Sequence, residues 1–103
     1  MAKRLRYALS FAPEAIEHLA AIESKYHGLL RRTIREQLTQ TPTGESRNRK
    51  PLRPNPIAPW ELRVGDLRIF YEVAASPASV VHILAVGIKD RNIVRIGGQE
   101  FQL

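Results

Sequence analysis

Residues 60–73 of the chain read WELRVGDLRIFYEV and alternate between apolar and polar side chains on both sides of a Gly65-Asp66 pair. Such alternation is typical of half-buried strands, and glycine at the first position of a two-residue loop suits a type II′ hairpin turn. This register places Arg63 directly opposite Arg68. Because like charges in opposed positions destabilise an antiparallel pair, the sequence indicates that an anion or a carboxylate lies beside the two arginines.

The segments around this hairpin predict the order of the remaining elements. Residues 5–11 alternate as a strand does, and Pro13 then begins the first of two amphipathic helices, which span residues 13–25 and 28–40. The short connection makes these helices an antiparallel hairpin. Further strands are expected over residues 59–65, 67–74, 80–86 and 92–96. The sequence therefore predicts a single α+β domain over residues 1–103, in which an N-terminal strand precedes a two-helix hairpin packed on a small antiparallel sheet of three to four C-terminal strands.

The composition excludes several classes of protein. The chain has 103 residues, no cysteine and no apolar run near the length of about 20 residues that spans a bilayer. Disulfides and thiolate metal sites are therefore excluded, and a reducing cytoplasm is the expected location. The apolar part of the basic N-terminus is too short for a secretion signal. With scattered histidines and no glycine-rich phosphate loop, we expect no metal, no cofactor and no membrane partner. We expect His18 and His27 to be exposed and His82 to be packed in the core.

The net charge of +6 is concentrated on one helix and on the loop that follows it. The prolines between Pro42 and Pro59 exclude helix and central strand there, so residues 42–58 are predicted to form a long loop. A concentrated positive field favours a nucleic acid, an acidic protein or an anionic membrane surface, although a well-solvated helix and loop would have the same composition. The basic residues concerned are Arg31, Arg32, Arg35, Arg47, Arg49, Lys50 and Arg53.

Two segments of the chain resemble one family of small toxins. The segments PLRPNPIAPWELRVGDLRIFYEV (residues 51–73) and VVHILAVGIKDRNIV (residues 80–94) are similar to the RelE/ParE family of bacterial and archaeal toxins, and the likeness extends over nearly the whole chain. The resemblance implies a toxin encoded beside a cognate antitoxin, which would dock on the cationic surface through a helix or an added strand. One branch of this family is ribosome-dependent and cleaves messenger RNA (mRNA), and another poisons DNA gyrase.

In the mRNA-cleaving branch, a basic strand pair supplies phosphate-binding arginines, and the resemblance places Arg63 and Arg68 at those positions. Cleavage through the 2′-hydroxyl requires a base, an acid and cations that hold the phosphate as charge develops on it. The guanidinium group suits the last role because its planar fork binds phosphate oxygens in pairs. A phosphate beside the arginines would also relieve their repulsion. The residues expected at the catalytic site are Glu61, Arg63, Arg68, Lys89 and Arg91, while the basic residues of the helix and loop are expected to contact ribosomal RNA.

The sequence also departs from that branch. Pro59 and Glu61 stand where two lysines precede the arginine in cleaving members, and Arg95 or Ile96 stands where a tyrosine is expected. Glu61 could act as the general base or as the salt-bridge partner of an arginine. Three functions are therefore open: an endoribonuclease that cleaves mRNA on the ribosome, a non-enzymatic toxin that acts on DNA gyrase, and an attenuated member that mainly binds its antitoxin.

Overall fold

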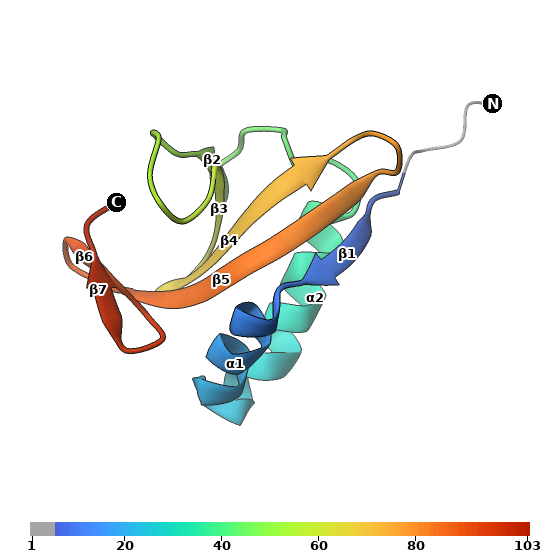
Figure 1. Ribbon diagram of the computed structural model, residues 1–103. Coiled ribbons are helices and arrows are strands. Elements are labelled where there is room, and N and C mark those ends of the chain that lie inside the picture. The colour runs from blue at the N-terminus through green and yellow to red at the C-terminus, as the bar shows by residue number, and fades with distance from the viewer. Residues whose placement is uncertain (1–5) are drawn as a thin grey trace.

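The computed structural model describes residues 6–103, which form one sheet with two α-helices against one of its faces (Figure 1). The predicted α+β class and the predicted order of strand, helical hairpin and C-terminal strands are confirmed. The helices are α1 (Pro13–Ala21), the short 3₁₀ helix η1 (Ser24–Tyr26) and α2 (His27–Leu38). The strands are β1 (Ala8–Phe11), β2 (Arg49–Pro51), β3 (Trp60–Val64), β4 (Leu67–Ala74), β5 (Val80–Asp90), β6 (Ile93–Ile96) and β7 (Gln99–Phe101).

The sheet is built around β5, its longest strand. The strands lie in the order β2-β3-β4-β5-β6-β7 with antiparallel pairing, and β1 joins β5 in parallel. Because β4 pairs along one edge of β5, the two shorter strands β1 and β6 share the other edge, β1 at residues 80–83 and β6 at residues 88–90. Figure 1 shows β1 beside β5, on the side of that strand where the helices lie. The sheet is therefore mixed, with its antiparallel part formed by the C-terminal strands.

The first helix is shorter than the predicted span of residues 13–25, because the chain leaves the helical conformation at Ile22, whose ψ is 142°. The imidazole Nε2 of His27 lies 2.8 Å from the carbonyl oxygen of Leu19 and 2.9 Å from that of Ile22. The carbonyl of Leu19 also accepts the backbone N–H of Ile22 at 3.1 Å, so the imidazole adds a second partner at a helix end, where carbonyls lack the regular helical bonds. The expected exposure of His27 is therefore wrong, since its half-buried ring joins the end of α1 to the start of α2.

The strands differ from the prediction in several places. β5 continues through Gly87 to Asp90 instead of ending at residue 86. β2 lies inside the segment predicted as a loop, and β7 follows the Gly97-Gly98 pair that the sequence predicts as the end of the last strand. These glycines have φ values of +56° and +82°, and they form the turn between β6 and β7. The N-terminal strand begins at Ala8, so its prediction is wrong for Arg6 and Tyr7, and its predicted start at Leu5 lies outside the described residues.

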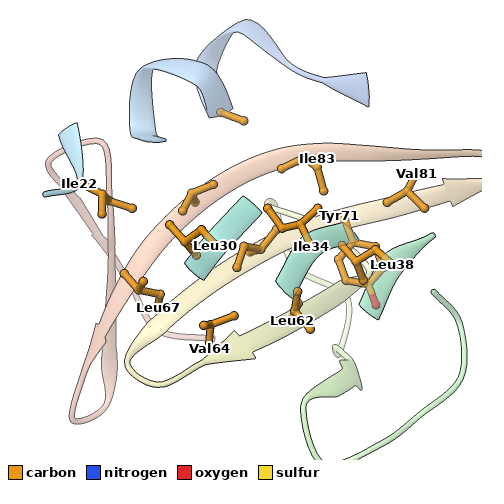
Figure 2. Packing of buried hydrophobic residues seen from close by; sticks show 13 residues of the cluster. Ile22, Leu30, Ile34, Leu38, Leu62, Val64, Leu67, Tyr71, Val81 and Ile83 are labelled. Carbon is orange, nitrogen blue, oxygen red and sulfur yellow. The ribbon is translucent and has the colours of Figure 1, made fainter. Parts of the chain in front are cut away.

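The main hydrophobic core lies between the sheet and the helices. Leu30, Ile34 and Leu38 of α2 pack against the strands (Figure 2). Tyr71 is fully buried there, stacks on Trp60 with ring centroids 6.2 Å apart, and donates its phenol O–H to the carbonyl oxygen of Pro42 at 2.6 Å. Burial raises the pKa of Tyr71, so the phenol stays protonated as a donor. This bond joins the segment after α2 to the centre of the sheet.

We expect the substitution Tyr71→Phe to lower the free energy of unfolding by about 1–3 kcal/mol, because the buried carbonyl of Pro42 would lose its partner. Urea titration followed by circular dichroism measures this free energy. Tyr26→Phe is the matched control, because its ring is partly exposed and the change should be within about 0.5 kcal/mol. Equal effects of the two substitutions would show that the bond from Tyr71 to Pro42 does not stabilise the fold.

A second, smaller cluster covers the opposite face of the sheet around Phe70. The proline-rich loop supplies part of this cover, and the side chain of Asn55 organises the loop. Its Oδ1 accepts from the N–H groups of Ile57 and Ala58 at 2.8 and 3.0 Å. Its Nδ2 donates to the carbonyl oxygens of Arg53 and Ala58 at 2.7 and 2.9 Å. Ile57 and Ala58 then pack against the cluster, so the long loop is an ordered part of this face.

Candidate functional site

The β3–β4 hairpin has the predicted register, with Arg63 directly opposite Arg68. Gly65 in the turn has a φ of +59°, as the first position of a type II′ turn requires. The neighbours Leu62 and Val64 belong to the core beneath the helices. Since successive side chains of a strand point to opposite faces, both arginines lie on the sheet face that is turned away from the helices.

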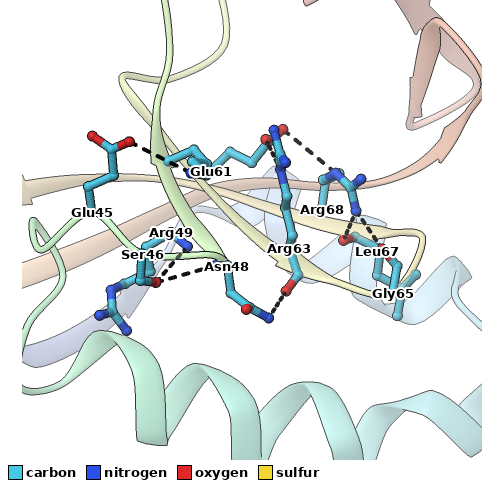
Figure 3. Close-up of polar contacts among 10 residues, drawn as sticks. Glu45, Ser46, Asn48, Arg49, Glu61, Arg63, Gly65, Leu67 and Arg68 are labelled. Carbon is cyan, nitrogen blue, oxygen red and sulfur yellow. Dashed lines mark hydrogen bonds and ion pairs between the residues drawn. The ribbon is translucent and has the colours of Figure 1, made fainter.

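One carboxylate lies between the two arginines. The Oε2 of Glu61 accepts a hydrogen bond from Nε of Arg63 at 2.8 Å, and its Oε1 lies 3.8 Å from Nε of Arg68 (Figure 3). Glu61 is only 5% exposed, so its charge acts at short range and with little screening. These three residues form the Glu61 cluster. Two guanidinium charges and one carboxylate charge leave the cluster with a net charge of +1.

Arg68 is the buried arginine of the cluster, with 9% of its surface exposed. Its terminal NH1 donates to the carbonyl oxygens of Gly65 and Leu67 at 2.7 and 2.9 Å, which fixes the guanidinium beside the turn. Burial lowers the pKa of Arg68 and the charge of Arg63 adds to this effect, while Glu61 and Asp66 oppose it. The Nε of Arg68 is buried without a hydrogen-bond partner. The guanidinium is therefore held in place with one donor unused.

Lys89 extends the positive charge onto β5. Arg68 lies opposite Gly87, and Lys89 lies two residues further along the strand, on the same face. The backbone N–H of Lys89 donates to the carbonyl oxygen of Asp66 at 2.7 Å, which joins β5 to the hairpin turn. A Cβ atom on Gly87 would lie 2.6 Å from the carbonyl oxygen of Arg95, so only glycine lets β6 approach this closely.

The predicted catalytic residues are thus brought together to different degrees. Glu61, Arg63 and Arg68 are in contact, and Lys89 shares their face of the sheet. Arg91 lies in the turn between β5 and β6, where it is exposed and has a φ of +59°. Its side chain therefore extends from the end of the sheet. Of the two roles considered for Glu61, the geometry favours the salt-bridge partner, because both of its oxygens face guanidinium groups.

The basic residues of helix α2 lie on the other side of the molecule. Arg31, Arg32 and Arg35 are exposed. Arg31 and Arg35 border a groove of about 400 Å³ whose walls include apolar residues of β1 and the two helices. Because α2 packs on the opposite face of the sheet from Arg68, the cations of α2 and those of the Glu61 cluster lie on separate surfaces.

The basic residues of the loop also divide into two groups. Arg47 and Arg53 are exposed. Arg49 instead points toward α2, where its Nε donates to the carbonyl oxygen of Gly44 at 2.8 Å and its NH1 bonds the side chain of Gln37. This guanidinium attaches β2 to the helix. Lys50, the next residue, lies directly opposite Glu61 on β2 and therefore on the face of the Glu61 cluster.

His18 has a structural contact that the sequence did not predict. Its Nδ1 accepts the backbone N–H of Val86 at 3.2 Å. Val86 lies on β5 between the residues that pair with β1 and those that pair with β6. A Cβ atom on Gly97 would lie 2.9 Å from Nε2 of the same ring. The expected exposure of His18 is wrong, because its half-buried ring fills the interval between two strands.

Over residues 6–103, no cluster of histidine, cysteine, aspartate or glutamate side chains is arranged to hold a metal ion. No helix in the same range is long and apolar enough to span a membrane.

Comparison with known protein families gives a match over most of the chain. The sequence model of a family described as "ParE toxin of type II toxin-antitoxin system, parDE" matches residues 9–93, which run from β1 to the first residue of β6. No curated protein matches the sequence. The matched span contains the whole Glu61 cluster, together with Lys50, Lys89 and Arg91.

Proposed function

The chain belongs to the ParE family of toxins of type II toxin–antitoxin systems, whose partner is an antitoxin protein. From the cationic face of the Glu61 cluster we propose that it cleaves mRNA on the ribosome. In this proposal the face of the Glu61 cluster binds the phosphate at the cleaved bond. In this reaction the 2′-oxygen would attack phosphorus as its proton passes to water, and the bond from phosphorus to the 5′-oxygen would break. The 5′-oxygen would take up a proton, which leaves a 2′,3′-cyclic phosphate and a free 5′-hydroxyl. Ribosome and mRNA are both in the cytoplasm, where the toxin would act.

The observation that carries this proposal is an excess of positive charge around one buried carboxylate. Arg63 and Arg68 share the charge of Glu61, and one N–H of Arg68 is buried without a partner. Because the Nε of Arg68 is buried, an anion would reach the cluster through Arg63, whose side chain is 42% exposed. A phosphate there would match the net charge of the cluster and accept hydrogen bonds from a guanidinium fork.

The same groups would act during the reaction. Arg63 and Arg68 would stabilise the charge that develops on the phosphate oxygens, which is the largest contribution that fixed cations can make. Lys89 and Arg91, from β5 and the turn after it, would hold neighbouring phosphates or protonate the departing oxygen. The ribosome would position the message, so that few proton-transfer groups are needed from the toxin.

Contacts with ribosomal RNA would come from the exposed cations. These residues are Arg31, Arg32, Arg35, Arg47 and Arg53. Arg49 is expected to contribute through the fold, because its guanidinium is bonded to Gly44 and Gln37. Phosphate contacts release counterions, so ribosome binding should weaken steeply as the salt concentration rises.

A toxin that acts on DNA gyrase without cleaving RNA is the second candidate. Two observations favour it: the matching family model describes a ParE toxin, the kind of family member expected to act on gyrase, and Glu61, the carboxylate nearest to the arginines, already accepts a hydrogen bond from Arg63. A base with an occupied proton-accepting oxygen is poorly placed to take a proton from a 2′-hydroxyl. A toxin that only binds its target needs no such group.

Induced expression in a bacterial host, followed by primer extension on several messages, distinguishes the two candidates. We expect new RNA 5′ ends inside translated regions, and we expect them to disappear from a message whose start codon is removed. The control measures supercoiling by purified gyrase in the presence of the purified toxin. Inhibited supercoiling without new RNA ends would refute mRNA cleavage and support the gyrase function.

A further inference from the structure

Strand β2 places Lys50 beside the Glu61 cluster. The sequence alone assigns this lysine to a loop. In the antiparallel register, Lys50 lies directly opposite Glu61, in the row of residues that continues through Phe70 to Ala85. Arg63 and Arg68 occupy the neighbouring row on the same face. We propose that Lys50 is a phosphate-binding residue of this site, an inference that rests on the proposed binding of RNA.

The position of Lys50 is fixed by bonds on both sides of it. Asn48 accepts the backbone N–H of Arg63 at 2.8 Å, and its side chain donates to the carbonyl oxygen of Arg63 at 3.1 Å. On the other side, the N–H of Leu52 donates to the carbonyl oxygen of Pro59 at 2.8 Å. The backbone of β2 is thus held against β3 in one register, and the lysine side chain starts from a fixed point beside Glu61.

The ammonium group of Lys50 is available for a ligand. Its ion pair is with Glu45 at 3.7 Å, and the side chains are 34% and 62% exposed. Long, exposed pairs of this kind contribute little free energy. The two oxygens of Glu61 face Arg63 and Arg68 instead. A flexible lysine stem can therefore exchange a weak pair with Glu45 for a phosphate bound at the cluster.

This arrangement compensates for the acid at position 61. Glu61 stands on β3 where a lysine would be expected from the resemblance, and Lys50 supplies a positive charge from the adjacent strand at the same level of the sheet. Lys50, Arg63, Arg68 and Lys89 then come from four consecutive strands of one face. A single phosphate group near the hairpin, or two successive phosphates of a strand of RNA, would meet cations from several directions.

The test compares Lys50→Met with Lys25→Met in the full chain. Methionine keeps much of the length of the lysine stem and removes its charge. Lys25 lies in η1, is exposed, and belongs to the helical side of the molecule, so the control removes the same charge elsewhere. The probe is a short single-stranded RNA with 2′-O-methyl groups, which cannot be cut through the 2′-oxygen. Its dissociation constant is measured by fluorescence anisotropy at a series of salt concentrations.

We expect Lys50→Met to weaken binding and to reduce the slope of log K against log salt by about 0.7, the value for one lost phosphate contact with a single strand. Lys25→Met should keep the wild-type slope. Equal slopes for the two variants would overturn the role of Lys50, and so would a wild-type protein that does not bind the probe. If the wild-type protein binds with the predicted slopes but produces no RNA ends in cells, the cleavage function fails while the phosphate-binding role of Lys50 stands.

Discussion

Arg68→Lys is expected to reduce mRNA cleavage on ribosomes by about 100-fold or more, because removing one donor that stabilises developing charge typically costs this much. Lysine retains the positive charge beside Glu61 but lacks the planar fork that can bind two oxygens of a phosphate while bonding the carbonyls of the turn. In the structure, one end of this fork is bonded to Gly65 and Leu67, and its Nε faces Glu61 without a hydrogen bond. The substitution therefore tests whether cleavage depends on the planar shape of the guanidinium group or only on its positive charge.

The measurement uses a purified translation system with a single message, and it compares cleavage rates at equal toxin concentration. Urea unfolding of the same samples tests whether the variant is folded at the assay temperature. Arg6→Lys is the matched control, since Arg6 is an exposed residue before β1 and should leave the rate unchanged. A folded Arg68→Lys protein that cleaves at the wild-type rate would show that Arg68 does not bind the reacting phosphate.

The part of this site that could be predicted from the sequence depends on local geometry. The Gly65-Asp66 pair and the alternation on both sides of it determine the register of a hairpin, so the opposition of Arg63 and Arg68 follows from residues close together in the chain. The same alternation assigns Glu61 to the face of the arginines. Alternation does not predict which side-chain atoms are in contact. The pairing of one buried carboxylate with two arginines therefore could not be predicted from it.

The parts that were missed depend on contacts between distant segments. β2 has three residues and ends at Pro51, so no periodic pattern marks it as a strand, and the position of Lys50 follows only from pairing with β3. Gly87 interrupts the apolar run of β5, and the sequence therefore predicts that the strand ends before it. In the structure the strand continues, and a glycine is required there because β6 approaches closely. The contact of His18 with Val86 likewise depends on where two other strands end along β5.

A second large effect is expected for Glu61→Gln, which removes the carboxylate that pairs with both Arg63 and Arg68 in the described part of the chain. We expect the free energy of unfolding to fall by about 3 kcal/mol, the lower part of the range for breaking a buried ion pair, because Arg68 is buried while Arg63 is partly exposed to solvent. The amide oxygen of glutamine can still accept from Arg63, so the loss comes mainly from charge. Urea titration measures it.

Glu100→Gln provides the comparison. Glu100 also pairs with an arginine, Arg95, at 3.3 Å, but both side chains are more than half exposed. Surface ion pairs of this kind contribute about 0–1 kcal/mol, so this variant should be nearly as stable as the wild type. If Glu61→Gln were equally mild, the carboxylate between the arginines would not be holding the hairpin in its observed form.

The cleavage rate of Glu61→Gln distinguishes the two roles considered for this residue. Loss of a general base lowers the rate by about 100- to 10,000-fold in a protein that is still folded. A salt-bridge partner acts only through the placement of Arg63 and Arg68, and the glutamine side chain keeps one of its two contacts. We therefore expect folded Glu61→Gln to cleave mRNA less than about 10-fold more slowly than the wild type. A decrease of about 100-fold or more in the folded variant would contradict the assignment of Glu61 as a salt-bridge partner.

Inorganic phosphate provides a test of the same cluster that does not depend on the target of the toxin. Removing the carboxylate charge raises the net charge of the cluster from +1 to +2, so an anion that binds between the arginines should bind Glu61→Gln more tightly than the wild type. A ligand at 100 times its dissociation constant stabilises a folded protein by about 2.7 kcal/mol. Added phosphate should therefore raise the unfolding midpoint of Glu61→Gln more than that of Glu100→Gln at constant ionic strength. Equal increases in the two variants would mean that phosphate acts on the general surface charge, and that the arginines opposed across the β3–β4 turn do not form an anion site.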